Sequence, residues 1–248
     1  MSGLALRPDY PYAYETHLHT SEGSACGRST GAEMARACKE AGYTGIFVTD
    51  HFYQGNTAVD RSLDWEDWVD GYCKGYENAK AVGDQIGLQV FFGWEQSFHG
   101  ADFLVYGLDK AWLKAHPEIR DCTVEEQYRL VKQDGGMVIH AHPFREAFYI
   151  PQTRLYPDAV DGVEVVNASH ARGYSGKEEL PEFDRKALEY AKEHDFPQTG
   201  GSDIHNVHLL GGGMAFAKPL NSVQDYIDAV LARQGIVLRA DPTFPGMG

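Results

Sequence analysis

Residues 45–51 read Gly-Ile-Phe-Val-Thr-Asp-His, a short apolar run that leads directly into an acid and a histidine. A run of this length, bounded by polar residues, is typical of a buried strand. The same arrangement recurs at four other places, where a predicted strand leads into His17-Leu-His19, Glu95, His140-Ala-His142 or Asp203-Ile-His205. Five strand ends that carry acids or histidines predict a site built where those strands end.

Apolar runs alternate with amphipathic segments along the chain, which predicts an α/β fold with a parallel sheet that closes into a barrel. Two segments open with capping boxes, Thr30 with Glu33 and Thr123 with Glu126, and the first stops at Gly42. Residues 144–157 are expected to form a long loop. The expected helices are 30–41, 64–81, 123–133, 182–193 and 223–233. The expected strands are 13–17, 45–50, 88–95, 102–107, 136–142, 163–167, 198–203 and 213–217.

The composition narrows the class of protein. The chain has 248 residues, 43% of them hydrophobic, which suits one domain over residues 1–248. Its net charge of −14 argues against long nucleic acid or an anionic membrane as a partner. The four cysteines form no Cys-x-x-Cys pair, and no segment has the length of a signal peptide or membrane span. We therefore expect a soluble, cytoplasmic protein with reduced thiols.

In parallel α/β folds the carboxyl ends of the strands form one rim, so the polar strand ends should meet there. Each motif alone has another interpretation: a helix cap for Asp50, a surface acid for Glu95, a turn at Asp203. Their shared position favours a metal site. A mixture of imidazole and carboxylate suits Zn, Mn or Fe, and the ligands are too many for one tetrahedral ion, so two or three ions are expected. The candidate ligands are His17, His19, His51, Glu95, His142, Asp203 and His205.

These motifs, in this order, resemble the PHP (polymerase and histidinol phosphatase) family of metal-dependent phosphoesterases. The resemblance covers residues 17–205 and implies a distorted seven-stranded (β/α) TIM-like barrel. It implies that one ion takes His17, His19, Glu95 and Asp203, that Glu95 bridges to a second ion held by His142, and that His51 and His205 take a third. Asp50, Glu95 and Asp203 are the residues expected to serve catalysis, with Asp50 orienting a ligand.

The chain departs from the common pattern of the family at two positions. Asp102 stands where many relatives carry a histidine, and it is expected to bind metal as well. Cys26, or its rival Glu22, stands where relatives often have an acid. His140 has no clear counterpart, and its role is open.

The function expected from the resemblance is hydrolysis of a small phosphate ester, a monoester or a diester, by a metal-activated hydroxide. A phosphate needs cationic or hydrogen-bonding partners beyond the metals, and the candidates are Arg145, Arg172, His170 and Asn167. The alternatives are an amidohydrolase that cleaves a C–N bond and a non-catalytic metal-binding module.

Overall fold

One mixed sheet of nine strands, in the order β7-β6-β5-β4-β3-β2-β1-β8-β9, lies at the centre of the part of the chain that the structure describes. The computed structural model describes residues 4, 6–148, 150–173, 182–208 and 210–238, the side chains of 171–173 excepted. The strands are β1 (Tyr12–Leu18), β2 (Gly45–Val48), β3 (Gln89–Phe98), β4 (Ala101–Tyr106), β5 (Met137–Ala141), β6 (Gly162–Asn167), β7 (Gln198–Gly201), β8 (Gly213–Phe216) and β9 (Ile236–Leu238).

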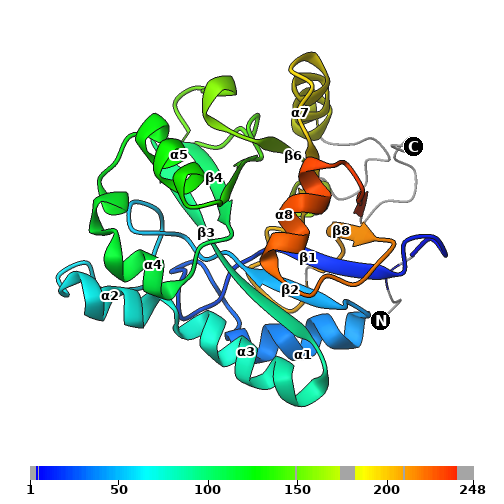
Figure 1. Ribbon diagram of the computed structural model, residues 1–248, viewed down its shortest axis with the longest axis horizontal. Helices are drawn as coiled ribbons and strands as arrows, with labels where there is room; N and C mark the ends of the chain where they lie inside the picture. Colours follow the sequence, from blue (N-terminus) through cyan, green and yellow to red (C-terminus); the bar gives the residue numbers. More distant parts are fainter. Residues whose placement is uncertain (1–3, 5, 149, 174–181, 209, 239–248) are drawn as a thin grey trace.

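Helices lie around the outside of the sheet (Figure 1). They are α1 (Gly31–Ala41), α2 (Trp65–Tyr72), α3 (Lys74–Ile86), α4 (Lys110–Ala115), α5 (Val124–Gln133), α6 (Ala168–Gly173), α7 (Glu182–Glu193) and α8 (Val223–Leu231), with 3-10 turns η1 (Pro117–Arg120) and η2 (Pro157–Ala159). Both predicted capping boxes are present, and α1 ends at Gly42 in the left-handed conformation, as predicted. No helix among the described residues is long and apolar enough to cross a membrane.

The sheet is nearly closed into a barrel, which confirms the predicted fold class. The end of β1 meets the segment after β7, where the His19 amide donates to the Ile204 carbonyl at 2.9 Å. Tyr14, Phe47 and Tyr106 pack with Tyr226 of α8 in one aromatic core between the strands and that helix. A second core lies under α1 and α3.

The predicted parallel sheet is mixed in the structure. β4 runs antiparallel to β3 and β5, and β8 runs antiparallel to β1 and β9. The cause at β4 is local: only His99 and Gly100 separate it from β3, and both have positive φ angles (51° and 92°). A two-residue loop of this conformation makes a hairpin, whereas a parallel connection needs a dozen or more residues. The implied count of seven strands is also exceeded, because the reversed β8 and the short β9 extend the sheet.

The single helix predicted over 64–81 is two helices, which break at Cys73. Gly71 and Gly75 flank the break and weaken the helix there. Gly75 also needs its lack of a side chain, since a Cβ atom would lie 2.0 Å from Thr20 Oγ1. The two halves then pack on different partners: Tyr72 of α2 donates to the Asp50 carbonyl, and α3 packs along α1.

Candidate metal centre

Six strands run in one direction, and their carboxyl ends share one rim of the barrel. The reversed β4 brings its beginning to the same rim, and this places Asp102 there. Histidines and acids from five of these strand ends meet in a cluster that we call the candidate metal centre. Its members are His17, His19, His51, Glu95, His142, Asp203 and His205, which are the predicted ligands apart from Asp102.

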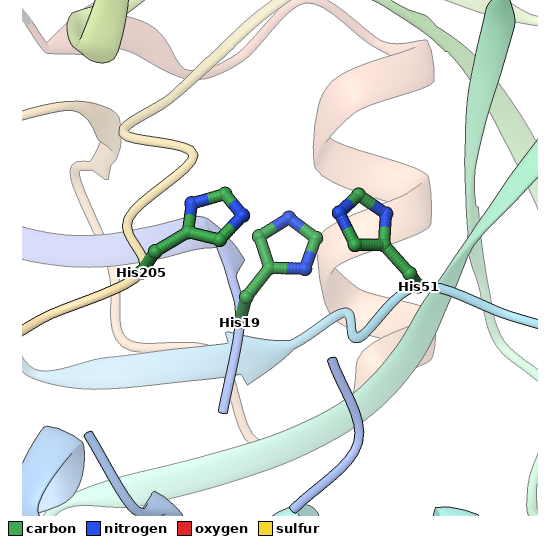
Figure 2. A group of neighbouring side chains, drawn as sticks. All are labelled: His19, His51 and His205. Atoms are coloured by element: carbon green, nitrogen blue, oxygen red, sulfur yellow. The ribbon is translucent and has the colours of Figure 1, made fainter. Parts of the chain in front are cut away.

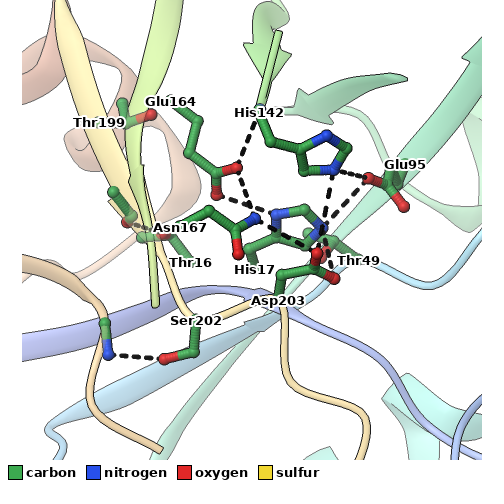
Figure 3. Close-up of polar contacts among 12 residues, drawn as sticks. Thr16, His17, Thr49, Glu95, His142, Glu164, Asn167, Thr199, Ser202 and Asp203 are labelled. Carbon is green, nitrogen blue, oxygen red and sulfur yellow. Dashed lines mark hydrogen bonds and ion pairs between the residues drawn. The ribbon is translucent and has the colours of Figure 1, made fainter. Parts of the chain in front are cut away.

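The ligand atoms of the centre fall into three groups, in each of which all atoms lie within 4.8 Å of one another. One group holds His19, His51 and His205, with the ring of His19 between the other two at centroid distances of 4.3 Å (Figure 2). The other two groups share His17: one combines it with Glu95 and His142 (Figure 3), and the other combines it with His19 and Asp203.

Glu95 lies at the middle of the centre. Its Oε1 atom is 3.2 Å from His17 Nε2 and 3.1 Å from His142 Nε2, and its Oε2 atom is 2.6 Å from His51 Nδ1. One carboxylate thus faces imidazoles of different groups through both its oxygens, which is the arrangement that a bridging ligand needs. Asp203 Oδ1 lies 3.1 Å from His19 Nε2 on the other side.

The electrostatics follow from packing acids and imidazoles together in a buried place. Burial alone would raise the pKa of Glu95, but the imidazoles of His51 and His17 hold it well below its usual range. Burial alone would also raise the pKa of Asp203, but the charges of Arg145 and His17 outweigh burial and hold this pKa well below its usual range. The carboxylates raise the pKa of His17 and of His51 well above the usual value against the effect of burial. Burial and the neighbouring imidazoles lower the pKa of His19.

The donor atoms fit a divalent metal. His17 Nε2, His19 Nε2, His51 Nδ1 and Glu95 Oε2 are all buried, and the close polar contacts given for them among the described residues are with the carboxylates and imidazoles of the centre itself. Buried polar atoms that face only one another in this way suit a shared ligand at their centre. Imidazole with carboxylate is the donor set of Zn, Mn and Fe, as predicted from the residue types.

Hydrogen bonds outside the centre fix which nitrogen of an imidazole faces inward. His17 Nδ1 donates to Glu164 Oε1 at 2.9 Å, so in the neutral ring its Nε2 atom carries the lone pair. Ser24 Oγ donates to Asp50 and therefore accepts from His19 Nδ1 at 3.1 Å. Such contacts orient metal ligands and raise their basicity.

Asp50 lies outside the three groups, among the hydrogen bonds that surround them. Its carboxylate accepts bonds from the Thr20 amide, the Thr20 hydroxyl and the Ser24 hydroxyl. Burial, only partly offset by these bonds, raises its pKa to about 6. The predicted orienting role of Asp50 agrees with this placement and stays a prediction, as does its role in catalysis.

The sequence analysis missed two buried acids, Glu164 and Glu15. Glu164 holds His17 and accepts from the His142 amide at 3.1 Å, and Glu15 accepts from the Ser202 amide at 2.9 Å. The signal was available in the strand Gly-Val-Glu-Val-Val-Asn, where one acid interrupts an apolar run. A buried acid in such a run needs a cationic or N–H partner, but the sequence does not say which one.

The backbone at two of the predicted ligands is strained. His142 has a φ angle of 29° and Asp203 one of 51°, both positive although neither residue is glycine. Such conformations cost about 1–3 kcal/mol each and gather at functional sites, where the surrounding structure holds them.

Arg145, His170 and Asn167, three of the four predicted substrate-binding residues, lie at the edge of the centre. The Arg145 guanidinium contacts Asp203 through one nitrogen and donates from Nε to His170 Nε2 at 3.0 Å. His170 in turn donates from Nδ1 to Asp184 at 2.8 Å. Asn167 Nδ2 donates to Glu164 at 3.1 Å and to Asp203 at 3.3 Å. The side chain of Arg172, the fourth, lies outside the described residues.

A hollow of about 580 Å³ opens beside Arg145, lined by the predicted loop after β5. Its described lining includes Glu146, Ile150, Pro151 and Thr153. The volume is in the range of small-molecule sites. The hollow therefore lies next to the guanidinium that reaches the centre.

The remaining candidate residues of the sequence analysis differ in where they lie relative to the three groups. Asp102 lies half-buried at the rim, where burial and the charge of Glu95 raise its pKa, but it belongs to none of the three groups. His140 packs face to face on Phe103 at 4.8 Å, away from the groups, and burial lowers its pKa to about 3. Glu22 accepts from the Gly31 amide at the start of α1. Cys26 lies beside His51 and His205, whose hydrogen bonds outweigh burial and lower its pKa to about 6.

Comparisons with known proteins agree with this architecture. The family described as PHP-associated matches residues 181–234. A two-domain protein from Bacteroides vulgatus, which contains a predicted PHP-like metal-dependent phosphoesterase, has a TM-score of 0.65 and 14% identity, over 96% of this chain and 68% of that chain. The chain has the PHP fold. The predicted resemblance is confirmed, and a comparison with curated proteins gives no match.

Other proteins of the PHP fold carry different names. An amidohydrolase from Chromobacterium violaceum, with bound sulfate and no metal, has a TM-score of 0.54 and 15% identity, over 91% of this chain and 98% of that chain. Endonuclease Q, in complex with a 27-mer duplex that carries an abasic lesion at the active site, has a TM-score of 0.55 and 16% identity, over 89% of this chain and 56% of that chain. The sequence-based argument against long nucleic acid is thus not supported, because a protein of the same fold binds a duplex.

Proposed function

We propose that this protein is a metal-dependent phosphoesterase that hydrolyses a small phosphate ester at the candidate metal centre. The observation that carries the proposal is the contact between Arg145 and Asp203. It brings a guanidinium against a predicted metal ligand, beside a hollow of small-molecule size. A planar cation next to divalent ions suits the charge and geometry of a phosphate.

The predicted ligands would hold two or three divalent ions, with Glu95 between them. Bound ions would lower the pKa of water and neutralise the charge of a phosphate group. Residues around the centre orient the ligands for metal binding: Glu164 and Ser24 hold the imidazoles of His17 and His19 in the tautomer that presents Nε2.

Arg145 would bind the phosphate oxygens. Its Nε atom is fixed by His170, which Asp184 orients from behind, so the guanidinium is held at the edge of the hollow. Asn167 adds a second hydrogen-bond donor, which at present bonds Glu164 and Asp203. Holding these donors in place before substrate arrives reduces the cost of ordering them.

The test is an assay of the protein loaded with manganese, against an aryl phosphate monoester and the matching diester. Asp203→Asn is the blank, because it removes a carboxylate that faces His17 and His19 while keeping the size of the side chain. We expect turnover that falls at least a hundredfold in the variant, with an unchanged circular dichroism spectrum. The preferred ester separates phosphatase from phosphodiesterase.

Full activity in Asp203→Asn would exclude the centre as the site of reaction. Hydrolysis of an amide, with none of either ester, would instead support an amidohydrolase, a name that one protein of the same fold carries.

A further inference from the structure

Glu164, a buried acid of β6, uses both of its carboxylate oxygens on residues at the candidate metal centre (Figure 3). Its Oε1 atom accepts from His17 Nδ1 at 2.9 Å, and its Oε2 atom accepts from the His142 amide at 3.1 Å. The Oε2 atom also accepts from Asn167 Nδ2 at 3.1 Å, and the same amide group reaches Asp203 at 3.3 Å. One side chain thus contacts two predicted ligands directly and a third through Asn167.

The backbone around Glu164 allows this close approach. The pairing of β6 with β7 shifts its register between Glu164 and Val166, and such irregularities occur beside active sites, where they re-aim a side chain. Gly201 of β7 has no side chain where Glu164 and His17 meet. A Cβ atom on Gly201 would lie 2.6 Å from Glu164 Oε1 and 2.4 Å from His17 Cβ. Any larger residue at this position would therefore separate the acid from the imidazole.

The bond to the His142 amide supports a strained backbone. His142 directly follows the last residue of β5 and has a φ angle of 29°, a conformation that is costly for a residue other than glycine. In this conformation the ring of His142 stacks on that of His17 at a centroid distance of 5.7 Å. The Nε2 atoms of the two rings lie 3.1 Å and 3.2 Å from Glu95 Oε1. Glu164 therefore holds both imidazoles that face this oxygen.

The three-imidazole group, which consists of His19, His51 and His205, is held by other contacts (Figure 2). Ser24 Oγ lies 3.1 Å from His19 Nδ1 and accepts from the His51 amide at 2.9 Å. The carbonyl oxygen of Asp203 lies 3.1 Å from His205 Nδ1. The layer of hydrogen bonds behind the centre is thus divided, with Glu164 on one side and Ser24 on the other.

We propose that Glu164 is the positioning residue of the two groups that share His17, and that the three-imidazole group does not depend on it. The carboxylate keeps His17 Nε2 directed inward and keeps the ring of His142 against it. A carboxylate behind an imidazole also raises its basicity, and loss of such a contact typically weakens metal binding tenfold to a hundredfold. The inference rests on the metal centre of the proposed function, whichever bond the protein hydrolyses.

Glu164→Gln keeps the shape of the side chain but not its bonds. One carboxylate oxygen accepts one N–H group and the other accepts two, so the amide of glutamine faces an N–H donor in either orientation. Glu15→Gln is the matched control, because Glu15 is as deeply buried. It accepts the amides of His17 and Ser202 through one oxygen, which glutamine retains. Its other oxygen faces the Tyr43 hydroxyl, which can accept from an amide.

The test is Zn²⁺ binding by the metal-free protein, measured by competition with a chromophoric chelator, which gives the number of ions and the affinity of each. We expect Glu164→Gln to bind one ion per chain as tightly as the wild type and the rest at least tenfold more weakly. His205→Ala should show the reverse, with loss of that one ion alone. Glu15→Gln should match the wild type. A role of Glu164 in folding alone would not distinguish one ion from another.

Wild-type affinity for every ion in Glu164→Gln would overturn the proposal, and so would equal weakening of every ion. Loss of the same ion in Glu164→Gln and His205→Ala would overturn it as well. Each of these results would leave the phosphoesterase activity standing. Absence of tight Zn²⁺ binding in the wild type would contradict the metal centre itself and this inference with it.

A second measurement needs no variant. Nuclear magnetic resonance of the wild type with ¹⁵N-labelled histidine follows the ring N–H group of His17 as Zn²⁺ is added. We expect the N–H group to stay on Nδ1, protected from exchange by Glu164, while the Nε2 resonance shifts on metal binding. Transfer of the N–H group to Nε2 would show that the metal takes Nδ1, and would overturn the role assigned to Glu164.

Discussion

At the scale of single residues, a chain of contacts leads from Asp184 through His170 and Arg145 to Asp203. Asp184 accepts from His170 Nδ1, which leaves Nε2 of that ring free to accept from Arg145. The chain fixes a tautomer and, through it, the direction of a guanidinium. Under the proposed function, Asp184 would act on substrate only by positioning Arg145.

Arg145→Ala is expected to raise the Michaelis constant for a phosphate monoester by roughly tenfold to a hundredfold, because a hydrogen-bonded charge pair is worth about 1.5–3 kcal/mol. Asp184→Asn should raise it less, since an amide can donate to His170 and reverse its tautomer. The double variant should match Arg145→Ala alone, because both changes act on one contact. Steady-state kinetics of the three variants check this.

The matched control for Asp184→Asn is Asp161→Asn. Asp161 accepts from the Val138 amide and pairs with Lys132 away from the centre, so its loss should leave the Michaelis constant unchanged. Additive effects of the two single changes would show that Asp184 does not act through Arg145.

At the scale of helices and strands, α1 and α3 approach so closely that only glycine fits between them. A Cβ atom on Gly31 would lie 2.0 Å from the Gly75 carbonyl oxygen, and one on Gly75 would lie 3.0 Å from Asp50 Oδ2. The packing of these helices therefore affects the hydrogen bonds between Thr20 and Asp50, which lie behind the centre.

Gly75→Ala is expected to destabilise the protein by about 1–3 kcal/mol, because the new methyl group forces Thr20 or the helix to move. Gly71→Ala is the control: it lies in α2, and its nearest contact would be Val59 Cγ1 at 3.1 Å. Its effect should stay within about 1 kcal/mol. Urea denaturation measures both, and equal effects would refute the close approach at Gly75.

The strands whose ends carry the centre were predictable because each predicted strand leads into a histidine or an acid. These side chains then come together because the carboxyl ends of parallel strands lie at one rim of the sheet. The hairpin at His99 and Gly100 was misread as part of a parallel sheet, although a two-residue loop allows no crossover. The break at Cys73 lies between Gly71 and Gly75, and local periodicity does not reveal the close approach of Gly75 to Thr20, a residue far away along the chain. The partners of Glu164 and Asp184 were not predictable either, because local periodicity does not reveal contacts between separate segments of the chain.

At the scale of the whole molecule, His17 and His51 of the metal-free centre bind protons more tightly than free imidazoles do. The carboxylates raise the pKa values of His17 and His51 above the ordinary value of about 6.5. Groups with a raised folded pKa stabilise the metal-free fold fully below about pH 6.5, and that stability is lost as pH rises through the raised pKa. Metal ions need these imidazoles neutral, so binding must release protons.

The increase in Tm on adding Zn²⁺ or Mn²⁺ should therefore be larger at about pH 8 than at about pH 6. Differential scanning calorimetry with and without metal at both pH values measures it. Asp203→Asn is the control and should show a smaller increase at either pH. An increase that is equal or larger at the lower pH would contradict protonated ligands in the metal-free protein.

The central claim is that one carboxylate, Glu95, joins a centre of more than one ion. The most direct test is the number of ions per chain, measured by inductively coupled plasma mass spectrometry after dialysis, in the wild type and in Glu95→Gln. We expect two or three ions in the wild type and the loss of more than one in the variant, because Glu95 faces imidazoles of different groups through both oxygens. A single ion in the wild type, or the loss of only one in the variant, would contradict a bridged centre.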